Sequence, residues 1–141
     1  MATRYVEVLA IQRPFPIGLD EANRVMFSCN FDALAAAPVG SFEEEILSVL
    51  NGAGLATRYN GATETGDTTI GPGARIPDGA GPWVELIDYG GRAPAETQNG
   101  SKYERLSIQV VVRATNYDSA RTRALAIWRA LDGLRDATVS P

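Results

Sequence analysis

Apolar and polar residues alternate in four stretches of the chain, and this alternation predicts four β-strands over residues 4–12, 25–31, 83–89 and 103–115. The clearest alternation runs from Val25 to Phe31, where every second side chain is apolar or a cysteine. Pro14 and Pro16 end the first stretch because proline cannot donate to a strand ladder. The first two strands, joined by a polar connection, therefore predict an antiparallel hairpin with a long tip.

Helical spacing replaces alternation in two other stretches. Ser41 and Glu44 have the sequence of a capping box, and the stripe that follows consists of Phe42, Ile46, Val49 and Leu50. Gly52 and Gly54 predict the end of this first helix. A second helix is expected after Asn116, with Asp118 as its N-cap and an apolar stripe of Ala124, Ile127, Trp128, Leu131 and Leu134. Residues 139–141 are expected to form only a short extended end.

Two segments carry no periodic pattern. Residues 60–82 contain six glycines, Pro72, Pro77 and Pro82, and almost no large side chains. A loop of this length in a compact domain is usually functional or disordered. Residues 90–101 are expected to form a second polar loop.

The length of 141 residues supports one domain with one hydrophobic core. The faces that alternation and helical spacing mark as apolar should pack together. The expected core consists of Val25, Phe27, Phe31, Leu106, Ile108, Val110, Ile127 and Leu131.

Composition narrows the possible functions. The chain has no histidine, one cysteine and a formal net charge of −4, which argues against a histidine-based catalytic site and a disulfide framework. No apolar stretch approaches the length of a membrane span. The first residues show no basic segment followed by an apolar run, so no secretory signal is expected. The arginines are scattered singly along the sequence, so no basic stripe for gripping nucleic acid is expected.

Candidate chemistry is sparse. The segment Gly71–Arg75 lacks the lysine and hydroxyl residue of a phosphate-binding loop, and Cys29 has no histidine to activate it. We expect no catalytic, cofactor or metal site. A small enzyme that used only carboxylates for catalysis would need Glu7 or Glu85 to converge with another acid in a deep pocket. A small-molecule-binding module would need an apolar cavity beneath residues 60–82.

Three segments together resemble a known family: PWVELIDYGG at 82–91, RATNYDSARTRALAIWRALDG at 113–133, and RYVEVLAIQRPFPIGLDEANRVMFSCNF at 4–31. They are similar to the tail terminator proteins of long-tailed phages, also called minor capsid or tail completion proteins. The resemblance covers most of the chain except residues 60–80. In that family the hairpin resembling residues 4–33 follows the last helix, whereas here it comes first. The chain is therefore interpreted as a circular permutant, in which residues 1–37 correspond to the family's C-terminal part and residues 41–141 to its N-terminal part.

The resemblance implies a fold and a role. The fold is α+β, a largely antiparallel sheet packed by two helices, and the permuted order predicts that Met1 and Pro141 lie close together. The implied role is that of a hexameric ring at the head-proximal end of the tail in the virion, assembled in the host cytoplasm. This ring would bind the tail tube protein and the head connector. DNA would pass through without tight binding, with no cofactor, membrane or enzymatic activity. A head-closure or stopper component is the alternative.

A ring subunit binds its neighbours through strand edges and loops rather than through a pocket. The candidate assembly contacts are Phe15, Ile17 and Asp20 in the first hairpin and Thr68, Ile70, Arg75 and Ile76 in the glycine-rich stretch.

Overall fold

The structure, a computed structural model, describes residues 3–21, 23–36, 42–55, 57–58, 69–72, 83–96 and 102–139. Its elements in chain order are β1 (Thr3–Ala10), β2 (Phe15–Leu19), β3 (Val25–Ala36), α1 (Phe42–Gly52), β4 (Thr57–Arg58), β5 (Thr69–Pro72), β6 (Trp83–Glu96), β7 (Lys102–Ala114), α2 (Tyr117–Leu131) and β8 (Leu134–Val139). Neither of these helices is long and apolar enough to cross a membrane.

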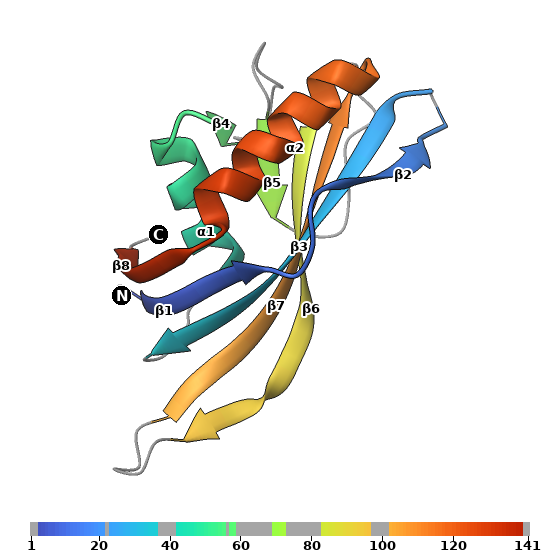
Figure 1. Cartoon of the computed structure of the whole chain (residues 1–141). Helices are drawn as coiled ribbons and strands as arrows, with labels where there is room; N and C mark the ends of the chain where they lie inside the picture. Colours follow the sequence, from blue (N-terminus) through green and yellow to red (C-terminus); the bar gives the residue numbers. More distant parts are fainter. Residues whose placement is uncertain are drawn as a thin grey trace.

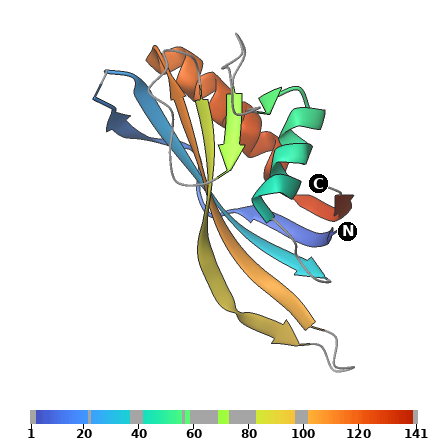
Figure 2. The same cartoon turned by 180° about the vertical axis from the view of Figure 1, so that it is seen from behind.

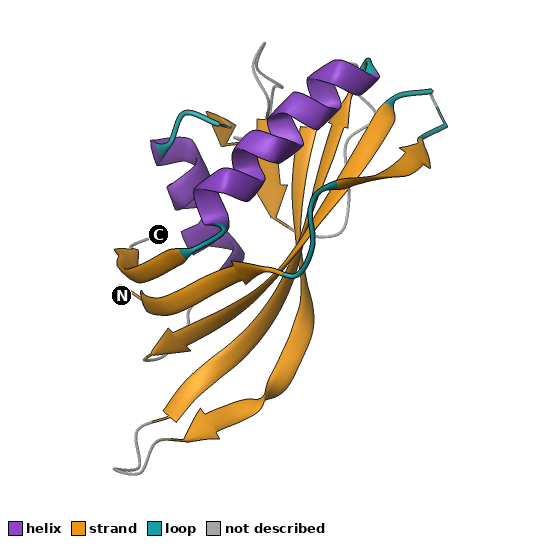
Figure 3. Ribbon diagram, in the orientation of Figure 1, coloured by secondary structure: helices purple, strands orange, loops and turns teal. Residues whose placement is uncertain are grey.

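The strands form one twisted sheet in the order β4-β5-β6-β7-β3-β1-β8, with β2 pairing with β3 beside this path (Figure 1). Within this order, each neighbouring pair of strands from β6 through β7, β3 and β1 to β8 is antiparallel. Strands β4, β5 and β6 run parallel to one another. Helices α1 and α2 accompany the sheet in the described part of the chain, and Figure 3 distinguishes them from the strands by colour. The predicted α+β class with a largely antiparallel sheet is confirmed.

Both helices lie against the sheet (Figure 2). One hydrophobic core joins the sheet to both of them. From the expected core, Phe27, Phe31, Ile108, Val110, Ile127 and Leu131 are buried in one cluster, and Val25 and Leu106 pack against it. In α1, Ile46 and Leu50 are buried as expected, and so is Leu47, which the sequence analysis omitted. The capping residue Ser41 lies outside the described residues.

Strand β3 is central because it pairs with β7 along its whole length, from Val25 opposite Ala114 to Ala36 opposite Tyr103. Its other edge is shared, since β2 pairs with its first part and β1 with Phe31–Ala36. The predicted antiparallel pairing of the first two strands is confirmed, but β1 lies mainly beside residues 31–36 of β3, beyond the predicted range 25–31. The connection treated as a loop contains β2, which tolerates Pro16 because its outer edge needs no ladder donor.

Two predicted loops contain strand. Strand β6 continues to Glu96, so the expected loop at 90–101 was wrong over its first part. Irregularities in the β6–β7 register after Asp88 and Arg92 accommodate the glycines and Pro94 that favoured a loop. Within residues 60–82, Thr69–Pro72 form β5 beside β6, and the other residues of that stretch lie outside the description.

The ends of α2 also differ from expectation. Asn116, not Asp118, is the N-cap, because its side-chain oxygen accepts a hydrogen bond from the Ser119 amide at 2.9 Å. The helix ends at Leu131, and Gly133 turns the chain with a φ of 80°. Leu134 therefore begins β8, a strand of six residues, instead of completing the helical stripe. Of the expected extended end, Val139 is the last residue of this strand, and residues 140–141 lie outside the described residues.

Strand β8 pairs antiparallel with β1, with Thr3 opposite Val139. The two ends of the described chain are thus neighbours in the sheet, as Figure 1 also shows. Met1 and Pro141, whose proximity the permuted order predicts, lie outside the described residues.

Candidate assembly surface

The large exposed apolar side chains are concentrated in the first two strands and the link between them. Leu9, Ile11, Ile17 and Leu19 are each 42–59% exposed, and we call them the β1–β2 apolar side chains. Scattered exposed leucines are ordinary on a protein surface, whereas several in one short segment favour contact with another protein. Tyr117 is also half exposed, but its ring packs edge-on against Phe27 at 5.2 Å.

The predicted contacts in the first hairpin have different environments. Ile17 is exposed and Phe15 is half-buried. The Asp20 carboxylate accepts hydrogen bonds from the Arg24 amide at 2.9 Å and from Arg24 Nε at 2.7 Å. Asp20 therefore fixes the turn between β2 and β3. Of these residues, the exposed Ile17 is more accessible to a neighbouring subunit than Phe15 or Asp20.

The predicted contacts in the glycine-rich stretch are only partly described. The backbone of Ile70 lies in β5, opposite Val84 of β6. Thr68, Arg75 and Ile76 fall outside the described residues. Their role in assembly stays a prediction.

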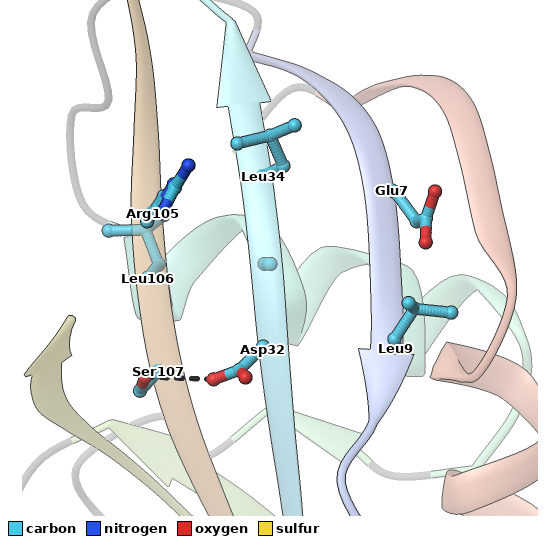
Figure 4. Close-up of a pocket in the computed structure, with 8 residues that line it drawn as sticks. Glu7, Leu9, Asp32, Leu34, Arg105, Leu106 and Ser107 are labelled. Carbon is cyan, nitrogen blue, oxygen red and sulfur yellow. Dashed lines mark hydrogen bonds between the residues drawn. The ribbon is translucent and has the colours of Figure 1, made fainter. Parts of the chain in front are cut away.

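A groove of about 250 Å³ crosses β1, β3 and β7 on the sheet face opposite the core (Figure 4). Cross-strand register builds it from two rows: Leu9, Asp32 and Ser107 in one, and Glu7, Leu34 and Arg105 in the other. Ser107 Oγ donates to Asp32 Oδ1 at 3.0 Å. Leucines flanked by both charge signs suit a polypeptide surface with apolar and charged residues.

Sequence reasoning missed this groove, although the signal was present. Alternation had already placed Glu7 and Leu9 on the same face of the first strand. The missing information was the register, which places Asp32 opposite Leu9 and Ser107 opposite Asp32.

The described residues contain no cluster of acids, cysteine or histidine that could hold a metal ion. Glu7 and Asp32 share the groove, which is open to solvent. Cys29 is buried, and burial raises the pKa of its thiol to about 12. A thiol with this pKa is a poor nucleophile at neutral pH.

Glu85 is the one carboxylate among the buried side chains of the described residues, at 6% exposure. Its Oε1 atom has no hydrogen-bond partner, and burial raises the pKa of this carboxyl. A buried acid with a raised pKa holds its proton in the folded state at pH values where the unfolded chain releases it.

Replacing Glu85 with glutamine should stabilise the chain at pH 8 and change little at pH 4. Below the ordinary pKa of glutamate both states are protonated, whereas above it the wild type loses stability as pH rises. Urea unfolding at pH 4, 6 and 8 measures this difference. Glu104→Gln, at an exposed position on β7, is the matched control, and an equal pH response in both variants would contradict the assignment.

Comparison with known proteins adds one finding. A family profile described as "Bacteriophage tail terminator protein" matches residues 56–139, from β4 to β8. No curated protein and no solved structure matches the chain.

Proposed function

Because the chain belongs to the bacteriophage tail terminator family, it is a structural protein of the phage tail, and we propose that it forms a ring that ends the tail tube and joins it to the head connector. The proposed ring is hexameric and lies at the head-proximal end of the tail in the virion, after assembly in the host cytoplasm. The family match over more than half of the chain carries the proposal. The proposed role involves no catalysis and no cofactor.

The surface chemistry supports assembly. A closed ring of identical subunits requires two different, complementary surfaces on each subunit. Three of the β1–β2 apolar side chains, Ile11, Ile17 and Leu19, offer one surface for burial against a neighbour, with Phe15 and Ile17 as contacts, while Leu9 belongs to the groove. The groove opposite the core offers a second surface. Thr68, Ile70, Arg75 and Ile76 are proposed to contact a neighbouring subunit or the tail tube protein.

The permuted chain order belongs to this proposal. The adjacency of β1 and β8, with Thr3 opposite Val139, supports a former connection between the two ends. The family match leaves out residues 1–55, which include the hairpin proposed to have moved. A solved relative in which strands equivalent to β1 and β3 precede the first helix would contradict this order.

Passage of DNA without tight binding also follows from the proposal. A net charge of −4 gives the subunit no overall attraction for phosphates. A subunit that bound duplex DNA tightly would slow the genome in the channel.

Native mass spectrometry of the purified chain at micromolar concentration tests the ring. The expected species is a closed oligomer of the 15.1 kDa chain, with six copies, visible as rings by negative-stain electron microscopy. A strictly monomeric mass, with no rings on addition of the tail tube protein, would contradict the proposed function.

A further inference from the structure

Arg13 meets two arginines of the distant helix α2 at one pocket on the outside of that helix. The pocket has a volume of about 160 Å³ and is lined by Arg13, Pro14, Arg121, Leu125 and Arg129. Arg13 and Pro14 come from the link between β1 and β2, and the other three from α2. The arginines are scattered singly along the sequence, but the fold brings residue 13 beside residues 121 and 129.

The geometry of α2 sets the size of this arginine pocket. Arg121, Leu125 and Arg129 are spaced by four residues, so they lie on one helix face over roughly 12 Å. Arg13 lies across from them, with its Cζ atom 5.7 Å from the centre of the Trp128 ring. This cation–π contact limits the freedom of the Arg13 guanidinium before any partner arrives.

The three guanidinium groups have no acidic partner within the described part of the chain. Arg24, by contrast, pairs with Asp20 at 2.7 Å, and Arg123 donates to the Leu55 carbonyl oxygen at 2.7 Å. Arg13, Arg121 and Arg129 are all exposed. Like charges gathered without a counter-charge repel one another, so an incoming anionic group would bind favourably.

The surroundings favour an acidic polypeptide over nucleic acid. Duplex DNA needs a basic surface that continues along many phosphates. Here the basic surface is short, and exposed Asp118 and Asp132 lie at the two ends of α2. Pro14 and Leu125 add apolar walls that suit the side chains of a peptide.

We propose that the arginine pocket binds the first turn of α1, Glu43–Glu45, of a second copy of this chain. This segment is the one run of three consecutive acidic residues in the sequence, and it lies at the start of α1. Arginine and carboxylate groups form the strongest class of hydrogen bond between side chains. The contact joins two different surfaces of the same chain, which is the arrangement that closes a ring. The inference rests on the proposed ring and identifies one of its contacts.

A charge exchange tests the contact directly. Arg121→Glu/Arg129→Glu alone should raise the protein concentration needed for half assembly by about tenfold or more, and so should Glu43→Lys/Glu45→Lys. An equimolar mixture should assemble again, since each subunit type then offers the charge that the other needs. Native mass spectrometry identifies the alternating ring through the different masses of the two variants.

Ser119→Glu/Thr122→Glu is the matched control, because it adds two glutamates at exposed positions of α2 outside the pocket. If both charge-reversed variants assemble at the wild-type concentration, the proposed contact between the arginine pocket and α1 is overturned, whereas the proposed ring is not. If both variants fail to assemble alone and their mixture also fails to assemble, Glu43–Glu45 is overturned as the segment that binds the arginine pocket.

If the wild type is monomeric and forms no rings with the tail tube protein, the proposed function fails and the pocket is tested separately. A labelled peptide of residues 41–52 is titrated into the chain beside its Glu43→Gln/Glu44→Gln/Glu45→Gln counterpart and a duplex DNA of about 20 base pairs. Binding of the acidic peptide alone, lost in the arginine variant, supports the pocket. Equal binding of both peptides, binding of neither, or tighter binding of the duplex overturns it.

Discussion

Replacing Ile17 and Leu19 with aspartate is expected to leave the chain folded and to abolish its assembly. Both side chains are exposed, at 42% and 59%, and neither belongs to the core cluster. A charge at a position that becomes buried in an interface must lose its hydration without a partner, which costs several kcal/mol. Far-UV circular dichroism should match the wild type, while native mass spectrometry should show monomers.

The control for this experiment is Ser119→Asp/Thr122→Asp, which adds the same charge at exposed polar positions of α2. This pair should assemble like the wild type. Assembly of the Ile17→Asp/Leu19→Asp chain at the wild-type concentration would place the β1–β2 apolar side chains outside every ring contact.

Replacing Phe31 with alanine should lower the free energy of unfolding by about 3–5 kcal/mol. Phe31 is fully buried on β3, between β1 and β7, opposite Ala10 on one side and Ile108 on the other. Hydrogen bonding on both edges holds β3 in place, so the sheet cannot close the cavity by shifting. A loss of this size is a large part of the stability of an ordinary domain.

Urea unfolding at a protein concentration below assembly measures this loss. Ile11→Ala, at a half-exposed apolar position, should change the free energy of unfolding by less than about 0.5 kcal/mol. A loss below about 1 kcal/mol for Phe31→Ala would contradict the central place of β3 in the core.

The elements with strong periodic signals were predictable from the sequence. Alternation identified the buried face of β3, and helical spacing identified the stripe of α2 that includes Ala124, Ile127 and Leu131. These patterns arise because a strand or helix buries one face, so the periodic order of apolar and polar residues reveals the face. The family resemblance was also readable, and the profile match confirms it.

Elements stabilised by their neighbours were not predictable in the same way. β2 contains Pro16 and Gly18, and the end of β6 contains Gly90, Gly91 and Pro94, so local propensity argues against strand in both. Pairing with β3 and β7 overrides that propensity. β8 was hidden because its first residue, Leu134, extends the helical spacing of α2.

The candidate assembly surface depended even more on tertiary structure. The exposure of Ile17 followed from its place on an outer strand, which the sequence did not reveal. The arginine pocket joins residues more than a hundred positions apart, and only the packing of α2 beside the β1–β2 link brings them together.

The pairing of β1 with β8 determines how the subunit responds to mechanical force. Thr3 and Val139 are opposite each other at the same end of the antiparallel pair. A pull that separates these two residues acts along the interstrand hydrogen bonds, which lie perpendicular to the strands. It therefore loads the bonds one after another, as in a zipper, rather than all at once in shear. Tension applied through Thr3 and Val139 should peel β8 from β1 at low force, long before the central pair of β3 and β7 is loaded.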